Sequence, residues 1–172
     1  MRSKLLRWEV PVFPRARAER ALRLLPRPRT LVPPRVMAAV IRTWWNGWVT
    51  ARRFQQRCGS RCIFGCGAGE DSVEHYSMCK VLWAFSAGFL GMQPAPHPAQ
   101  RRAAFLLLDG TQVSDCVLTR SAVRMAAAYF VHCRVRHVSA SCAAAAEMLP
   151  QAAREAVRGH PRATAALDGW WR

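Results

Sequence analysis

The sequence predicts a mostly α-helical protein, in which a small helical module lies between a basic, Pro/Arg-rich N-terminal arm and a further helical segment. Three observations lead to this prediction. Apolar residues recur at helical spacing in several segments and do not alternate with the period of two that is typical of strands. Cysteine and histidine gather between residues 58 and 79. Arginine and proline are concentrated in the first 35 residues.

The composition limits the classes of protein to consider. The chain has 172 residues, of which 51% are hydrophobic, so it can build the core of one ordinary domain or of two very small ones. Its longest apolar stretches are far shorter than the ~18 residues of a membrane-spanning helix, and we therefore expect no membrane partner.

The charge favours an anionic partner. The formal net charge is +16, and residues 1–61 hold 15 basic but 2 acidic residues. Neutralising phosphates releases counterions, so such a chain gains affinity for nucleic acid. Only Lys4 and Lys80 are lysines, however, and an excess of arginine, alanine, proline and glycine also follows from GC-rich codons. The charge alone therefore does not decide the function.

Residues 1–35 are expected to form a poorly ordered basic arm, because six prolines interrupt any continuous helix. An arginine-rich start also resembles a transit peptide, which keeps the mitochondrion and the plastid as alternative locations. A helix is predicted over residues 36–45 from apolar residues at i, i+3, i+4, i+7 and i+8. Asn46-Gly47 follows and suits the positive φ of a helix C-terminus.

A second helix is predicted to begin at Asp71 or Ser72, because Asp71 and Glu74 form a capping-box pattern. Its apolar stripe continues to Phe89, so the predicted module spans residues 36–93. A Pro-rich linker over 94–100 and a helical segment over 101–138 follow. Residues 139–172 are predicted to be an Ala-rich helical tail, interrupted by Pro150.

The cysteine and histidine spacing predicts a metal site. Glycines flank the second cysteine and let the backbone bring two thiolates toward one point. A histidine and a cysteine at i and i+4 share one face of the second predicted helix. Four protein ligands leave no open coordination position, which favours a structural zinc ion that stabilises the module. The predicted ligands are Cys62, Cys66, His75 and Cys79, with Cys58 as an alternative.

The same stretch resembles a known family. Cys62-Ile-Phe-Gly-Cys66-Gly67, the run from Glu70 to Tyr76, Cys79 and Trp83 are similar to the zinc-binding region at the C-terminal end of reverse transcriptases of non-LTR retrotransposons. The similarity covers about residues 37–86. The spacing differs, because the family usually has two residues between its first cysteines and four between its histidine and last cysteine. The resemblance implies a zinc module that handles RNA or DNA, and a nuclear location.

The polymerase itself is not recognisable in this sequence. The aspartates are Asp71, Asp109, Asp115 and Asp168, and no two of them are adjacent, as a pair holding the metals of nucleotidyl transfer would be. We therefore expect a non-catalytic module, a fragment or relic of such an element, with no catalytic residues.

Basic and aromatic residues beside the metal site are candidates for contacts with nucleic acid. Three tryptophans of this region either stack on bases or belong to the core. The alternatives are a zinc-folded module that binds a protein partner and a decayed remnant of a mobile element. The candidate phosphate-binding residues are Arg42, Arg52, Arg53, Arg57 and Arg61, and the tryptophans are Trp44, Trp45 and Trp48.

Overall fold

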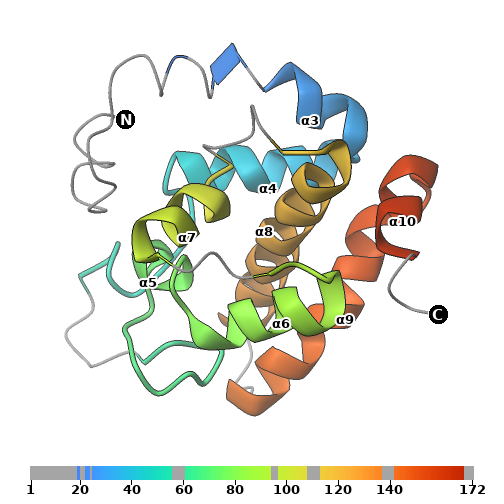
Figure 1. Ribbon diagram of the computed structural model, residues 1–172. Helices are drawn as coiled ribbons and strands as arrows, with labels where there is room; N and C mark the ends of the chain where they lie inside the picture. The colour runs from blue at the N-terminus through green and yellow to red at the C-terminus, as the bar shows by residue number, and fades with distance from the viewer. Residues whose placement is uncertain are drawn as a thin grey trace.

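The computed structural model describes residues 19, 22–23, 25–55, 61–93, 97–107, 113–136 and 142–168. These residues are mostly helical (Figure 1), which confirms the predicted fold class. Within these ranges, extended pairing is limited to one antiparallel bridge between Arg61 and Glu70. The helices are α3 (Pro26–Leu31), α4 (Pro34–Trp44), α5 (Val73–Tyr76), α6 (Lys80–Leu90), α7 (Pro98–Phe105), α8 (Asp115–Arg136), α9 (Cys142–Val157) and α10 (Pro161–Asp168).

The long helix α8 lies at the centre, and the other helices surround it (Figure 1). It packs most extensively against α9 and α4, and it also contacts α3, α6, α7 and α10. Small side chains make this packing possible, because Ala122 and the run Ala126 to Ala128 are fully buried and let the neighbouring helices approach closely. The fold is therefore organised around one buried helix rather than around two separate cores.

Helix α4 forms where the apolar spacing predicts it. It begins two residues before the expected start because Pro34 occupies its first position, where a missing N–H costs no hydrogen bond. Trp44 is buried and donates its Nε1–H to the carbonyl oxygen of Leu106 at 2.8 Å. The helix ends before Asn46, whose φ of 52° is the left-handed conformation expected for this position.

The helix predicted to begin at Asp71 or Ser72 is in fact two helices. Ser72 rather than Asp71 is the N-cap of α5, since its side chain accepts a hydrogen bond from the His75 backbone N–H. The chain leaves the helix after Tyr76 and resumes at Lys80 in α6. Trp83 stabilises this break by donating its Nε1–H to the Ser77 carbonyl oxygen at 2.8 Å.

The expected arm, linker and tail also differ from the structure. The end of the arm contains α3, which buries Leu31, and the end of the linker contains the first residues of α7, which begins at Pro98. Pro150 lies inside the continuous helix α9. A proline there costs about 3 kcal/mol, but tertiary burial of the neighbouring Leu149 offsets this cost. Residues 1–18 lie outside the described ranges.

The predicted boundary over residues 94–100 does not separate two cores. Val73 and Leu82 from the expected module belong to the same buried cluster as Leu118 and Leu149. The Cys/His-rich region and the helices after it therefore share one hydrophobic core.

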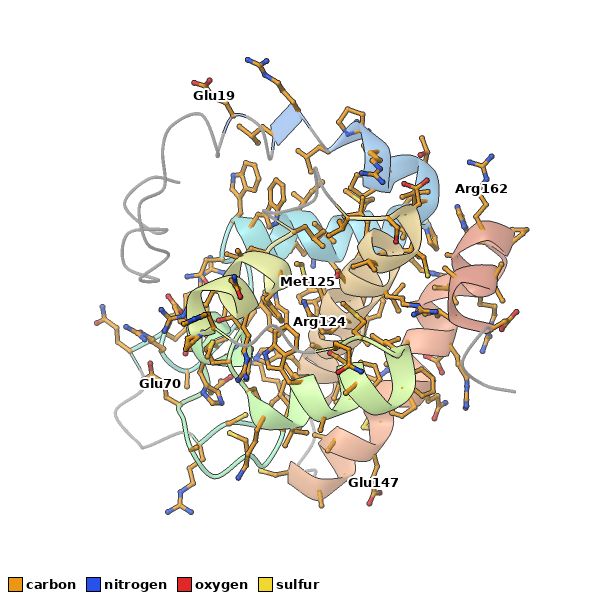
Figure 2. All side chains as sticks on the ribbon, in the orientation of Figure 1. Glu19, Glu70, Arg124, Met125, Glu147 and Arg162 are labelled. Carbon is orange, nitrogen blue, oxygen red and sulfur yellow. The ribbon has the colours of Figure 1, made fainter. Side chains whose placement is uncertain are left out.

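Arg124 lies in the middle of this core, next to Met125 on α8 (Figure 2). It is 1% exposed, and its Cζ lies 4.3 Å from the ring centroid of Trp83 and 5.3 Å from that of Phe105. Its Nη2 donates to the Ala104 carbonyl oxygen, while Nε and Nη1 have no hydrogen-bond partner. Burial lowers the pKa of Arg124 to about 9. The structure thus contains a buried cation that is only partly compensated.

Replacing this cation with an apolar side chain of similar length is expected to stabilise the protein. Arg124→Met should raise the free energy of unfolding by about 1–3 kcal/mol, because the methionine fills the space without a desolvated charge. Urea denaturation followed by circular dichroism measures the change. Arg124→Gln is the control, and it should destabilise the fold because it keeps an unsatisfied buried polar group. A loss of stability in Arg124→Met would mean that the ring contacts outweigh the desolvation.

Candidate metal centre

The structure brings the four predicted ligands together. One potential ligand atom from each of Cys62, Cys66, His75 and Cys79 lies within 4.8 Å of the other three. The Sγ atoms of Cys62 and Cys79 are 3.7 Å apart, and Cys66 Sγ is 3.1 Å from His75 Nε2. A tetrahedral ion with metal–sulfur bonds of about 2.3 Å places its sulfur ligands about 3.8 Å apart. All three cysteines are free thiols, so the cluster has the donors and the size of a metal site.

The loop before α5 curls in the way the sequence predicts. Gly65 and Gly67, on either side of Cys66, both have φ of 72°, a conformation that residues with a Cβ rarely adopt. The Gly65 backbone N–H donates to the Cys62 carbonyl oxygen at 3.0 Å. The Cys62 backbone N–H donates to the Gly69 carbonyl oxygen at 2.9 Å. These hydrogen bonds close the turn and place both thiols on its inner side.

The other two ligands do not share one helix, contrary to the prediction. His75 belongs to α5, whereas Cys79 is the residue immediately before α6. The break between the helices replaces the i, i+4 relation of a continuous helix, and the two side chains still converge on one point. Cys79 therefore lies beside the free backbone N–H groups at the start of a helix, which stabilise a thiolate.

The electrostatics of the two facing thiols support a deprotonated ligand. A hydrogen bond with Cys79, together with burial, raises the pKa of Cys62 to about 12. The same hydrogen bond, with backbone N–H groups of α6, lowers the pKa of Cys79 despite its burial. Of the two thiols, Cys79 is therefore the more readily deprotonated, and Cys62 is the donor of their hydrogen bond. Binding of a metal ion would displace the remaining thiol protons.

Buried aromatic rings enclose the cluster. Phe64 and Tyr76 form an edge contact with centroids 5.2 Å apart, and Trp48 lies 5.4 Å from Tyr76. Each of these three residues is at most 1% exposed. Cys142, the first residue of α9, lies against the opposite part of the loop and directs its thiol toward the Cys62 carbonyl oxygen at 3.7 Å. These contacts hold the buried side of the loop in place, whereas Gly67 and Ala68 on the other side are exposed.

A second polar cluster lies next to the site and was not predicted from the sequence. Asp71 is buried and accepts hydrogen bonds from the Ala51 backbone N–H at 2.8 Å and from the Tyr76 hydroxyl. Its Oδ1 is 3.4 Å from Nε2 of His132 on α8. The capping-box pattern assigned Asp71 to a helix start, and no local signal connects it with a histidine so distant in the sequence.

The candidate phosphate contacts are not equivalent in the structure. Arg42 donates to the Tyr129 hydroxyl, and Arg53 lies with its Cζ 5.8 Å from the Phe54 ring centroid. Arg52 is compensated by an ion pair with Glu70 at 2.6 Å, whereas Arg61 is exposed. Arg57 and the alternative ligand Cys58 lie outside the described residues.

The three tryptophans also separate into two groups. Trp44 and Trp48 are buried, and Trp48 donates its Nε1–H to the Thr43 hydroxyl at 2.9 Å. Trp45 is 61% exposed. Two of the three therefore belong to the core, and one is exposed.

Gly69 supplies a direct test of the site geometry. A Cβ at this position would lie 2.1 Å from His75 Nδ1, so the imidazole packs flat against the bare glycine backbone. Gly69→Ala should displace His75 and weaken metal affinity by at least about tenfold, as loss of ligand orientation does. A competition titration with a chromogenic chelator measures this affinity. Gly88→Ala is the control, because no atom lies within 4 Å of a Cβ there. Equal affinities in the two variants would contradict His75 as a ligand.

Comparisons of the chain with protein-family models, curated proteins and solved structures found no match. Within the described residues, no helix has the length and apolar character needed to cross a membrane. The geometry of the Cys/His cluster therefore carries the functional interpretation.

Proposed function

We propose that the protein is a non-catalytic, zinc-binding module that associates with nucleic acid. The observation that carries this proposal is the convergence of three cysteines and one histidine within 4.8 Å. Thiolate and imidazole donors in a compact four-ligand set suit zinc better than hard cations such as magnesium or calcium, which prefer oxygen.

The role of the ion follows from the number of its ligands. With Cys62, Cys66, His75 and Cys79 all bound, a tetrahedral zinc has no position for a substrate or a reactive water. The three cysteines of the cluster are at most 2% exposed, so they also shield a bound ion from solvent. We therefore propose a structural zinc.

The proposal of nucleic-acid binding rests on charge and on resemblance. The net charge of +16 favours phosphate contacts, and Arg42, Arg53 and Arg61 lie exposed on the structure. The cysteine and histidine spacing resembles the C-terminal zinc region of non-LTR retrotransposon reverse transcriptases, which would place the partner among RNA or DNA.

Metal analysis of the purified full chain tests the zinc site. We expect one zinc per chain in the wild type, loss of zinc in His75→Ala, and retention of zinc in Cys58→Ala. Loss in both variants would bring Cys58 into the ligand set. A folded wild type without metal would contradict the proposed site.

Titration of the zinc-loaded chain with nucleic acid at several salt concentrations tests the partner. The logarithm of the affinity should fall linearly with the logarithm of the salt concentration, by ~0.9 for each phosphate contacted on duplex DNA and ~0.7 on a single strand. Absence of binding to both RNA and DNA at low salt would contradict the proposal.

A further inference from the structure

We infer that one surface of the molecule, formed by Arg42, Trp45, Arg53, Phe54 and Arg136, binds single-stranded nucleic acid in preference to duplex. We call this surface the arginine–aromatic stripe. The inference rests on the proposed association with nucleic acid and adds to it the strandedness of the partner and the residues that select it.

The stripe holds the two most exposed large hydrophobic side chains of the described residues. Trp45 is 61% exposed and Phe54 is 53% exposed, whereas the neighbouring Trp44 and Trp48 are buried. Contact of aromatic rings with water is unfavourable, and exposed apolar patches rimmed by polar residues mark interaction sites. Both rings lie on the segment between α4 and the metal-binding loop.

One end of the stripe is on α4. Arg42 lies in the last turn of α4, Trp45 is the residue that directly follows the helix, and both are exposed. Arg42 donates a hydrogen bond to the Tyr129 hydroxyl of α8, and its Cζ lies 5.7 Å from the centroid of that ring. This contact joins the exposed side of α4 to α8.

The other end of the stripe lies about two turns further along α8. Tyr129 and Arg136 are seven residues apart, which places them on one face and about 10 Å from each other. The Cζ atom of Arg136 is 5.3 Å from the Phe54 ring centroid, and that of Arg53 is 5.8 Å from it. These contacts connect Arg42 at the end of α4 to one part of α8, and Phe54 to the last turn of the same helix.

The arginines of the stripe are not neutralised by acidic side chains of the described residues. Arg52 and Arg134, which lie nearby in sequence, form ion pairs with Glu70 and Glu155. No such ion pair with a described residue involves Arg42, Arg53 or Arg136.

The aromatic rings decide between a single strand and a duplex. In a duplex the bases are stacked inside and present only their edges, so rings on a protein surface find no base face to contact. Unpaired bases stack on aromatic rings and on guanidinium planes. An acidic peptide would satisfy the arginines but would give Trp45 and Phe54 no comparable partner. A single strand is thus the ligand that uses all parts of the stripe.

Fluorescence anisotropy with the zinc-loaded full chain tests the inference. The probes are a labelled single strand of mixed sequence, about 20 nucleotides long, and the corresponding duplex, since this length exceeds the ~4–16 nucleotides of common single-strand sites. The variants are Trp45→Ala, Phe54→Ala and Arg136→Gln. Val117→Ala is the control, because Val117 is also an exposed apolar residue, at 39%, but lies near the opposite end of α8. Circular dichroism and zinc content verify that each variant is folded.

We expect the wild type to bind the single strand about tenfold more tightly than the duplex, since each stacked base contributes substantially to affinity. Trp45→Ala and Phe54→Ala should each weaken single-strand binding about five- to tenfold without changing its salt dependence. Arg136→Gln should reduce the salt slope by about 0.7. Val117→Ala should bind as the wild type does.

Two results would overturn the inference, and they differ from a failure of the proposed function. Equal binding of single strand and duplex, unaffected by Trp45→Ala and Phe54→Ala, would contradict the role of the arginine–aromatic stripe. The proposed association with nucleic acid would remain. Tighter binding of polyglutamate than of the single strand, lost in Arg136→Gln, would assign the stripe to an acidic protein. Binding of neither nucleic acid would instead contradict the proposed function itself.

Discussion

Removal of zinc by a chelator is expected to lower the free energy of unfolding by about 5 kcal/mol, for a site with a dissociation constant of about 0.1 nM and free zinc of about 1 µM. The physical reason is that zinc binds the folded arrangement of four ligands and has little affinity for the unfolded chain. The expected loss depends on the free zinc concentration, and each tenfold reduction in zinc should remove about 1.4 kcal/mol.

The loss should be greatest around the metal and should extend into the core through the aromatic rings. Phe64 and Tyr76 pack against each other, and Tyr76 in turn contacts Trp48. We therefore expect the near-ultraviolet circular dichroism to collapse on chelation while α8 and α9 retain most of their far-ultraviolet signal. Hydrogen exchange should show rapid loss of protection at the Cys62 and Gly65 amides.

Cys116→Ser provides the control for zinc removal. Cys116 is half-buried and directs its thiol to the Ala166 carbonyl oxygen at 3.7 Å, away from the metal cluster. This variant should keep one zinc and its response to the chelator. A wild-type chain whose denaturation midpoint is independent of zinc concentration would contradict a folded-state metal site.

Asp71→Ala is expected to lower the free energy of unfolding by about 3–5 kcal/mol, the usual cost of removing one member of a buried, hydrogen-bonded charge pair. The change leaves the Ala51 backbone N–H and the Tyr76 hydroxyl without their acceptor, and His132 without its carboxylate. Urea denaturation at saturating zinc measures this loss separately from any change in metal content.

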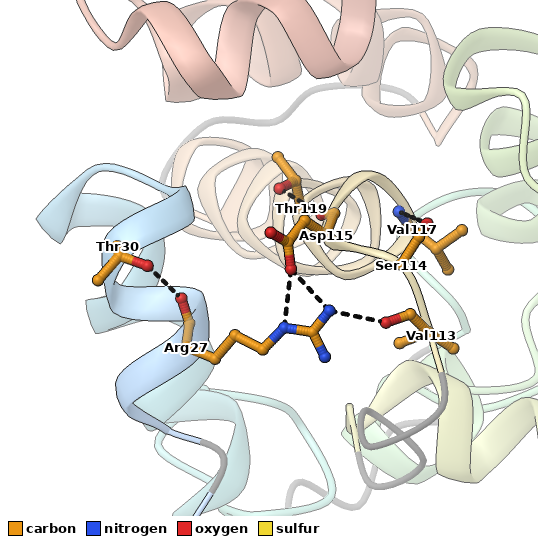
Figure 3. A network of polar contacts seen from close by, with 7 residues as sticks. All are labelled: Arg27, Thr30, Val113, Ser114, Asp115, Val117 and Thr119. Carbon is orange, nitrogen blue, oxygen red and sulfur yellow. Dashed lines mark hydrogen bonds and ion pairs between the residues drawn. The ribbon is translucent and has the colours of Figure 1, made fainter.

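Asp115→Ala is the matched control, because it removes an aspartate from an exposed pair. Arg27 reaches from α3 to the Asp115 carboxylate at the start of α8 and also donates to the Val113 carbonyl oxygen (Figure 3). The Asp115 side chain is 61% exposed, so its loss should cost less than about 1 kcal/mol. Similar losses in Asp71→Ala and Asp115→Ala would contradict the importance of the buried cluster.

The same cluster gives a pH dependence with a defined sign. Burial alone would lower the pKa of His132, but hydrogen bonds and charge interactions with Asp71 and Cys133 together outweigh burial and raise it. Burial alone would raise the pKa of Asp71, but hydrogen bonds from His132, Tyr76 and Ala51 lower it. The stabilisation of the fold by His132 is complete below pH 6.5, the pKa of histidine in the unfolded chain. It is lost as the pH rises through the raised pKa of His132 in the folded protein. The stabilisation of the fold by Asp71 is complete above pH 3.8, the pKa of aspartate in the unfolded chain. It is lost as the pH falls through the lowered pKa of Asp71 in the folded protein.

His132→Gln isolates the histidine part of this dependence. Glutamine keeps a donor for Asp71 but carries no charge at any pH. The difference in unfolding free energy between wild type and variant should therefore be larger at about pH 6 than at about pH 8.5. Zinc binding changes with pH in the same direction in both proteins, so it does not create this difference. A difference that is constant over this range would mean that folding does not shift the pKa of His132.

The metal cluster was predictable because its information is local. All four ligands lie between Cys62 and Cys79, and the glycines that turn the loop are adjacent to Cys66. Helix α4 was equally predictable, since one face of it is buried and the apolar period records that burial.

The features that sequence reasoning missed depend on contacts between distant segments. The break between α5 and α6 is stabilised by a hydrogen bond from the Trp83 side chain. Asp71 does not cap α5, and its carboxylate instead lies beside His132 of α8. Pro150 stays helical because Leu149 is fully buried against other elements. Periodicity contains none of these contacts, so local preference was overruled by tertiary packing.

Trp48 connects the residues around the Cys/His cluster with the exposed end of α4. Its buried ring lies 5.4 Å from Tyr76, the neighbour of a metal ligand, and 5.4 Å from Tyr129, which accepts the hydrogen bond of Arg42. The Cys/His loop and Arg42 are thus both connected to one buried side chain. Thermodynamic reciprocity then applies. If zinc changes the affinity for a ligand at Arg42 by some factor, that ligand must change the affinity for zinc by the same factor.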